Sequence, residues 1–582
     1  MINTNRIALI FLRERRRLRS SEVALIALAV LVGVVVGLLT LIQGGLAHGL
    51  QRLFYGSDVA QLSALDSIEP FRLLALPFGG LLIAGIALWA KRHRQSAPID
   101  VVEANALHGG HIPARDSLLV SAQTIVSNGC GASVGLEAAY AQMGGGAASV
   151  AGSRLKLRRN DLRTMVGAGA GAAVGAAFGA PLTGAFYAFE IVIGAYTPAA
   201  IAPVAAACIA ATLTIRAAGG APYQISLPSA HAIVTVDYLL YAALGFACAL
   251  VAVSLMQAVT SIENAARRLP IADFWRPVVG GALLIPIGLV TPQALSAGHG
   301  ALHLDLSVPV GLGFLVGVFL LKLLASSITL GFGFRGGLFF ASLFLGSLAG
   351  QIFALALSAL PGAPQVDPVD AALVGMAAMA VSVVGGPMTM SMLVLESTHD
   401  FALASVALAA VLCASTLVRE TFGFSFSTWR LHMRSETIRS ARDVGWVRNL
   451  TAGRMMRRGV PTAGADISVA ELRRRHPLGS TGRVVLTDDS GRYAGIVPTA
   501  LAFAATTDPD ARAGDIAIQR EVALRPEQDV AAAMQAFEEW GADDLAVVDE
   551  EGRLLGLLSE RHVRRRYAEE LEKAQRELFG ES

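Results

Sequence analysis

The sequence predicts an all-α polytopic membrane domain of broken, tilted helices, followed by a soluble α/β tail. The first observation is composition: 54% of the 582 residues are hydrophobic and 16% are charged, whereas about a quarter are charged in soluble globular proteins. The second is that charges of both signs concentrate after residue 450. The third is that glycine interrupts several long apolar runs. Together these features place a membrane domain first and a soluble domain second.

The apolar runs indicate how many helices to expect. Nearly charge-free stretches approach the roughly 20 residues that a membrane-spanning helix needs, among them 23–42, 238–256, 312–324 and 371–395. They predict on the order of ten or more helices. Glycine-broken stretches such as 164–192 and 331–350 are tolerated inside a membrane only where backbone lines a cavity or is buried in protein. Broken helices therefore indicate a path for a solute.

Basic clusters at 13–19, 91–94 and 156–163 predict the orientation, because positive side chains favour the cytoplasmic side. Residues 1–20 form a basic N-terminal segment ahead of a retained first helix. The apolar run that begins at Val23 is too long for a signal peptide. We expect both termini in the cytoplasm, at a bacterial-type inner (plasma) membrane.

Several classes of function are disfavoured. A net charge of +2 over this length gives no basic footprint for nucleic acid. The four cysteines lie singly in apolar sequence, without the spacing of a zinc site or a disulfide framework. His299 and His303 have the i, i+4 spacing of a metal pair, but the glycines around His299 favour a short surface loop, and we expect no metal.

Two patterns have the letters of enzyme motifs. Residues 131–135, Gly-Ala-Ser-Val-Gly, match a nucleophile elbow but lie in an apolar segment instead of following a strand of a soluble sheet. Residues 331–336, Gly-Phe-Gly-Phe-Arg-Gly, match a dinucleotide motif without its βαβ unit or later acid. No set of nucleophile, base and acid is complete, so we do not expect an enzyme.

An internal repeat divides the membrane domain. Residues 179–183, Gly-Ala-Pro-Leu-Thr, are echoed by residues 385–389, Gly-Gly-Pro-Met-Thr, and in each copy an acid, Glu190 or Glu396, follows the proline by nine residues. Paired interruptions in two halves are typical of a transporter whose site lies between the repeats. Chance similarity of Gly- and Ala-rich helices is the alternative. The matched position of the two acids favours a structural role for both, bonding loop amides at the membrane edge.

Glycine-rich helix starts lie at matching places in the two halves, at 131–135 and 333–337. A helix N-terminus offers free N–H groups and the positive end of a dipole to an anion. Without Cβ atoms, an ion can approach main-chain amides such as those of Leu338 and Phe339. Plain helix packing through small residues is the alternative.

Glu137 is the only charged residue between Ser117 and Ser153. An ionisable side chain within a membrane segment is a functional hypothesis by default. Its charged form would occupy an anion site and its neutral form would vacate it, which describes a proton-sensitive gate. The alternative is a structural carboxylate that caps a neighbouring helix.

The tail contains a duplicated unit. Residues 484–497 and 545–559 each form a strand, an acidic turn with glycine, and a second strand. Residues 564–578 are dense in charges of both signs and suit an exposed terminal helix.

These motifs resemble the CLC family of chloride channels and proton/chloride antiporters, with a tandem CBS (Bateman) module behind the membrane domain. Gly135-Leu-Glu137-Ala-Ala resembles the family motif Gly-Arg/Lys-Glu-Gly-Pro, which implies that Glu137 is the external gating glutamate. Gly337-Leu-Phe-Phe-Ala resembles Gly-x-Phe-x-Pro, whose amides, here those of Leu338 and Phe339, coordinate the central anion. The resemblance also implies two inverted repeats and a homodimer with one path per subunit.

The chain departs from the family at three places in the path. Ser96 is carried over as an anion ligand, although Gln-Ser-Ala-Pro-Ile replaces Gly-Ser-Gly-Ile-Pro. Ile191 stands where family antiporters hold a second, internal proton glutamate and where family channels have an apolar residue. The inner-gate tyrosine of the family falls in a stretch without tyrosine, so that Phe426 or Ser427 takes its place.

In the tail, Ser559-Glu-Arg-His562 lacks the aspartate of the nucleotide-contacting Ser/Thr-x-x-Asp motif, which leaves adenine-nucleotide binding open. The predicted division is an anion-transport domain at 21–430, a linker at 431–449, a first CBS domain at 450–512, and a second CBS domain with a terminal helix at 513–582.

The expected function is transport of chloride or another small anion by a glutamate-gated path, channel-like or weakly proton-coupled and modulated by the CBS domains. No cofactor is required beyond the transported ion. A proton/chloride antiporter is the alternative within the family. A membrane enzyme and a CBS-regulated cation transporter are alternatives of other classes, and the latter would need several carboxylates along its path.

Overall fold

The computed structural model describes residues 22–56, 61–93, 98–220, 233–307, 310–433 and 450–579. The chain divides into two compact units, Met1–Asp443 and Val444–Ser582, so the boundary lies within the predicted linker. The predicted N-terminal segment 1–20, Ser96, and residues 434–449 of the linker lie outside the described residues.

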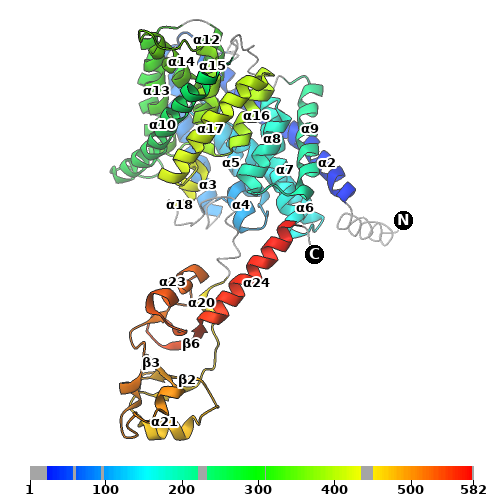
Figure 1. The fold of residues 1–582 in the computed structure, drawn as a ribbon. Helices are drawn as coiled ribbons and strands as arrows, with labels where there is room; N and C mark the ends of the chain where they lie inside the picture. Colours follow the sequence, from blue (N-terminus) through cyan, green and yellow to red (C-terminus); the bar gives the residue numbers. More distant parts are fainter. Residues whose placement is uncertain are drawn as a thin grey trace, which may run out of the picture. The chain divides into compact units, whose positions relative to one another are not determined.

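The first half of the membrane unit runs from α2 to α9 (Figure 1). Its elements are α2 (Glu22–Tyr55), η1 (Leu62–Ala64), η2 (Pro70–Leu74), α3 (Ala75–His93), α4 (Val101–Leu107), α5 (Ala114–Gly129), α6 (Glu137–Arg154), α7 (Arg159–Phe178), α8 (Pro181–Tyr187), the π-helix η3 (Ala188–Ile193) and α9 (Pro198–Ala217).

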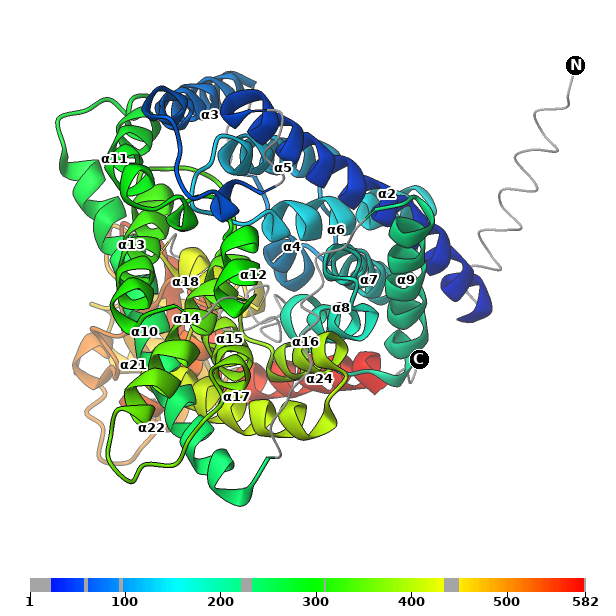
Figure 2. The same cartoon turned by 90° about the horizontal axis from the view of Figure 1, so that it is seen from above.

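The second half repeats this order from α10 to α18. Its elements are α10 (Thr235–Arg268), α11 (Arg276–Val290), η4 (Pro292–Ala294), α12 (His299–Ser307), α13 (Leu312–Gly331), α14 (Phe339–Ser358), α15 (Pro368–Val384), α16 (Pro387–Thr398), α17 (Phe401–Thr421) and α18 (Phe426–His432). Seen from above, the first half, blue to cyan, and the second half, green to yellow, lie on different sides, and α8 packs against α16 between them (Figure 2).

Seven of the described helices are long and apolar enough to cross a membrane, and three more apolar helices of 10–17 residues are too short. Proline and glycine interrupt the helices in both halves. α7 ends at Gly179, whose φ of +68° suits the left-handed cap of a helix. Pro181 and Pro387 then occupy the first turn of α8 and α16, where their missing N–H costs nothing. The broken helices of the predicted fold class are therefore present in both halves.

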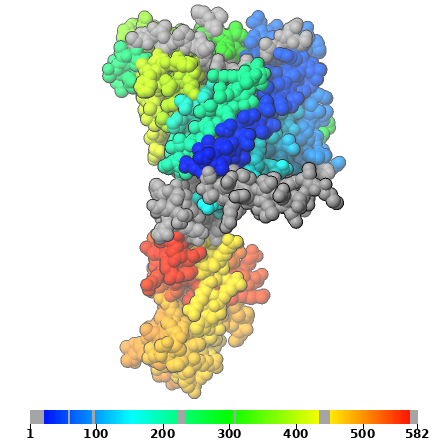
Figure 3. Space-filling view, turned by 90° about the vertical axis from the view of Figure 1, so that its right-hand side faces the viewer, coloured from blue at the N-terminus to red at the C-terminus, as the bar shows by residue number. Residues whose placement is uncertain are grey.

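Close helix crossings hold each half together, and glycine makes them possible. A Cβ at Gly144 of α6 would collide with the carbonyl oxygen of Gly169 on α7, and a Cβ at Gly346 of α14 would collide with that of Gly375 on α15. Each crossing pairs the same two helices of its half, so the halves share their packing as well as their order. Long tilted helices cover this core, and α2 runs obliquely across one face beside α9 (Figure 3).

The tail unit contains two three-stranded sheets of the same design. In the first, the strand order is β1 (Thr462–Gly464), β2 (Arg483–Thr487) and β3 (Tyr493–Pro498); in the second it is β4 (Ala523–Leu524), β5 (Asp544–Val548) and β6 (Leu554–Ser559). The first two strands of each sheet are parallel and the last two antiparallel, with an irregularity at Leu486/Thr487 and at Val547/Val548. The duplicated strand-turn-strand unit of the sequence is thus one hairpin of each sheet.

The remaining elements of the tail are helical: α20 (Ala452–Met455), α21 (Val469–Arg475), α22 (Thr499–Ala502), η5 (Ala513–Ile516), α23 (Val530–Trp540) and α24 (Glu560–Phe579). The short helix that precedes each sheet in the sequence packs on the other sheet. α20 packs on β6 of the second sheet, and η5 packs on β3 of the first. The predicted boundary at residue 512 therefore separates the two sheets, but α20 and η5 each pack on the sheet that lies on the other side of this boundary.

Candidate anion-binding site

The glycine-rich starts of α6 and α14 meet at the centre of the membrane unit. Gly135 and Gly337 form an antiparallel bridge, in which the Gly135 N–H donates to the Gly337 oxygen at 3.0 Å and the Gly337 N–H donates back at 3.3 Å. The first turns of two long helices, each with N–H groups that have no partner in their own helix, thus begin at one point. Partial positive charge from both helix ends converges there.

A second pair of hydrogen bonds shows that the halves are related by an approximate two-fold axis. The backbone N–H of Ser133 donates to Thr329 Oγ1 at 3.2 Å, and the backbone N–H of Arg335 donates to Ser127 Oγ at 3.1 Å. Residues 133 and 335, 127 and 329, and 135 and 337 are all separated by the same 202 positions. The site therefore lies on the axis between two inverted repeats.

Glu137, the first residue of α6, places its carboxyl group at this point. The side chain is 4% exposed, and the backbone N–H of Phe340 donates to its carboxylate. The other oxygen, Oε2, is buried without a hydrogen-bond partner among the described residues. It lies so close to Gly135 that a Cβ there would collide with it, and 3.8 Å from where a Cβ of Gly337 would be. The carboxyl group of Glu137 therefore occupies the space that faces both helix starts.

Leu338 and Phe339, the two predicted main-chain ligands, are 2% and 4% exposed and form the first turn of α14. Phe178 at the end of α7 packs on Phe339, with ring centroids 5.3 Å apart. The glutamate, the predicted amides and an apolar wall thus surround one small volume. Such an arrangement can hold a partly dehydrated anion without a buried cation in direct contact with it.

A cavity of about 590 Å³ ends at Glu137. Its lining residues include Arg52 of α2, which carries a permanent positive charge. Among the described residues that line it, Glu137 is the only acid. Any ion in this cavity therefore lies close to the Glu137 side chain.

The expectation of a surface loop at His299 and His303 is wrong. Both residues belong to α12, and the His299 ring stacks on Phe340 with ring centroids 3.7 Å apart. Glycine on each side of His299 suggested a loop, but Gly298 adopts a φ of +103° and the helix starts directly after it. Among the described residues there is no group of three or more His, Cys, Asp or Glu arranged for a metal ion.

Lys322 is a charged residue that the sequence analysis missed. It lies in the middle of α13, is fully buried, and donates from Nζ to the carbonyl oxygens of Ser296 at 2.7 Å and Ala294 at 3.3 Å. Ser296 lines the cavity, so Lys322 helps to fix the backbone of the cavity wall there. The only signal in the sequence was a single lysine in an otherwise uncharged run of 20 residues.

Glu190 and Glu396 bind the helix starts of opposite halves. Glu396 accepts hydrogen bonds from the backbone N–H of Leu182 at 2.8 Å and from the N–H and Oγ1 of Thr183 at 2.7 Å. Glu190 accepts from the N–H of Met388 at 3.1 Å and from the N–H and Oγ1 of Thr389 at 2.9 and 2.7 Å. Each carboxylate therefore caps the proline-started helix of the other repeat.

We expect Glu396→Gln to lower the free energy of unfolding by about 2 kcal/mol, because charge-assisted hydrogen bonds become neutral and one amide proton meets an N–H. Glu190→Gln should behave alike. The midpoint of thermal unfolding of the detergent-solubilised protein measures the effect. Glu263→Gln, which removes only an i, i+4 ion pair with Arg267, is the control and should change little. Equal unfolding midpoints for all three variants would show that Glu190 and Glu396 do not stabilise the helix starts that they cap.

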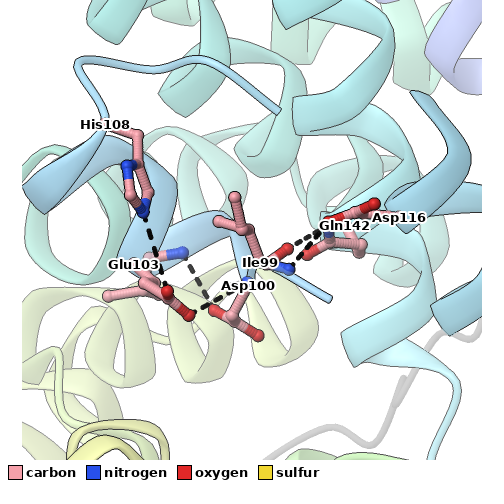
Figure 4. A network of polar contacts seen from close by, with 7 residues as sticks. Ile99, Asp100, Glu103, His108, Asp116 and Gln142 are labelled. Carbon is pink, nitrogen blue, oxygen red and sulfur yellow. Dashed lines mark hydrogen bonds and ion pairs between the residues drawn. The ribbon is translucent and has the colours of Figure 1, made fainter. Parts of the chain in front are cut away.

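Ile191 lies in η3, and its side chain is 9% exposed. η3 packs against α4, whose start is held by a polar network (Figure 4). Asp100 caps Val102 N–H at 2.9 Å, and Glu103 lies 3.7 Å from His108. The sequence analysis did not single out these groups, which place titratable side chains on the helix beside the apolar position.

The same network fixes Ile99, two residues before the start of α4. Asp116 accepts from the Ile99 N–H at 2.9 Å, and Gln142 Nε2 donates to the Ile99 oxygen at 2.9 Å (Figure 4).

Of the two candidates for the inner gate, Phe426 is buried at 7% exposure and Ser427 is exposed. Both residues lie on α18 (Phe426–His432).

Comparison with known proteins shows which family the chain belongs to. The family model described as "Voltage gated chloride channel" matches residues 78–419, and the model for the CBS domain matches residues 513–569. The "Voltage-gated ClC-type chloride channel ClcB" of Citrobacter koseri is 28% identical over 400 residues, which cover 67% of this chain and 95% of that protein. The protein of the same name from Salmonella typhimurium is 27% identical over 405 residues, with the same coverage.

Solved structures share the fold. A slow cyanobacterial Cl−/H+ antiporter has a TM-score of 0.61 and 22% identity, covering 71% of this chain and 98% of that one. A CLC-type fluoride/proton antiporter has a TM-score of 0.57 and 21% identity, covering 68% and 96%. With seven helices among the described residues that can cross a membrane and a family match over more than half its length, this chain is an integral membrane protein that belongs to the CLC family of voltage-gated chloride channels and carries a C-terminal CBS module.

Proposed function

We propose that the protein moves chloride across the membrane along a path gated by Glu137, passively or with weak proton coupling. The observation that carries this proposal is the position of the Glu137 carboxylate, which faces the bridged starts of α6 and α14 with one oxygen unpartnered. An anion can reach the amides of Leu338 and Phe339 only when this carboxylate gives way. Protonation removes its charge and allows that movement.

Ile191 supports weak coupling. It is apolar and buried at the place where the resemblance puts the internal proton glutamate of antiporters, so a proton that reaches Glu137 has no carboxylate there to receive it. We further propose that no enzymatic step is involved, that the CBS pair modulates the path, and that two copies assemble, each with its own path. The termini then face the cytoplasm, at a bacterial-type inner membrane.

A second candidate is a proton/chloride antiporter. The packing of α4 against η3 favours it, because Asp100 and Glu103 bring two acids to the helix that touches the Ile191 segment. These acids provide a different internal proton route if protons cross at all.

Liposomes that contain the purified wild-type protein distinguish the two candidates. Under a chloride gradient, we expect chloride efflux with little or no uphill movement of protons. Steady proton pumping against its own gradient would establish the antiporter. A complete lack of chloride flux, with protein-free liposomes as the baseline, would refute both.

A further inference from the structure

The hydroxyl of Tyr187 has no hydrogen-bond partner among the described residues. Tyr187 ends α8, and its side chain is 8% exposed. No described residue forms a hydrogen bond with its hydroxyl. A buried tyrosine normally finds a hydrogen-bond partner, because leaving the hydroxyl unpaired costs free energy. A molecule or ion that enters the space beside this hydroxyl can therefore accept a hydrogen bond from it.

The surroundings of Tyr187 place it beside the candidate anion site. Its ring lies 6.3 Å from that of Phe339, whose backbone opens α14. The carboxylates of Asp100, at the start of α4, and of Glu137, at the start of α6, both act electrostatically on its hydroxyl. Tyr187 thus lies between the gating glutamate and the α4 network, beside the first turn of α14.

The anchoring of α8 keeps this placement rigid. Glu396 holds the N–H groups of Leu182 and Thr183 in its first turn, and η3 continues directly from Tyr187. A rigid donor is worth more to a ligand than a mobile one, because less conformational freedom is lost on binding.

We infer that the Tyr187 hydroxyl donates a hydrogen bond to the transported anion while the anion is held by the amides of Leu338 and Phe339. This inference rests on the proposed function. Phe426, in the place of the inner-gate tyrosine, has no hydroxyl to offer, so Tyr187 supplies a donor from a different helix. The donor also offsets the repulsion that Asp100 and Glu137 exert on an anion between them.

Tyr187→Phe tests the inference, because it removes one oxygen and leaves the ring. Potassium chloride is titrated calorimetrically into protein prepared in a chloride-free buffer. We expect chloride to bind about tenfold more weakly, as for the loss of a hydrogen bond to a charged group. The preference for chloride over thiocyanate in liposome flux should also fall, since an apolar pocket without this donor suits a weakly hydrated anion.

Tyr241→Phe is the matched control, since Tyr241 of α10 is 2% exposed and loses the same atom. Its chloride affinity should equal that of the wild type. An unchanged affinity and selectivity in Tyr187→Phe would overturn the inference, as would a loss of proton movement with chloride binding intact, which would make Tyr187 a proton relay. The proposed function fails separately, if the wild-type protein itself neither binds nor transports chloride.

Discussion

Chloride flux through the Glu137→Gln variant should no longer depend on pH between about 4.5 and 7.5, and any proton movement that accompanies wild-type flux should fall below a tenth. Glutamine matches glutamate in shape but cannot ionise. In the wild type, the buried carboxylate lies beside Gly135 and Gly337, and a negative charge there repels an incoming anion. A neutral amide exerts no such repulsion, so the flux should be at least as high as that of the wild type at its most acidic pH.

Liposome flux of chloride, with proton movement recorded by a pH electrode, measures both effects. Glu420→Gln is the control: this carboxylate is exposed near the end of α17, beside Arg419, and should leave the pH profile unchanged. A Glu137→Gln profile that still follows that of the wild type would show that another group gates the path.

Gly350→Ala should destabilise the membrane unit by more than about 3 kcal/mol, or prevent its folding. A Cβ at Gly350 of α14 would overlap the carbonyl oxygen of Ala371 on α15 and lie 2.7 Å from the Ala372 Cα. Overpacking a side-chain contact commonly costs about 1–3 kcal/mol, but here the obstacle is backbone in a helix that cannot rotate away. The two helices must separate to make room, which would also loosen the start of α14 at the candidate anion site.

Gly317→Ala is the matched control, because it adds the same methyl group to α13 where nothing lies within 4 Å. It should be neutral or stabilise the helix by up to about 1 kcal/mol. The midpoint of thermal unfolding in detergent, read from the monodisperse fraction on size exclusion, compares the two variants. Similar midpoints for both would contradict the tight crossing of α14 and α15.

The sequence by itself determined the architecture and the central residue. Apolar runs, and the glycine and proline residues that interrupt them, are local features. They predicted the membrane domain, the broken helices, the internal repeat and the importance of Glu137. The same locality explains the error at His299, where glycines that suggested a loop lead directly into a helix. The family resemblance was equally local, since it depended on short motifs in their order along the chain.

Only the tertiary structure decided which residues meet. Glu190 and Glu396 were recognised as a matched pair, but their exchange of partners across the repeats depends on the two-fold axis, which joins positions about 200 residues apart. Lys322 and Tyr187 were recognised in the same way, because the burial of their side chains is a property of surroundings assembled from several helices. A local pattern shows where a helix starts, whereas the convergence of several helix starts on one point results from long-range packing, which no short stretch of sequence encodes.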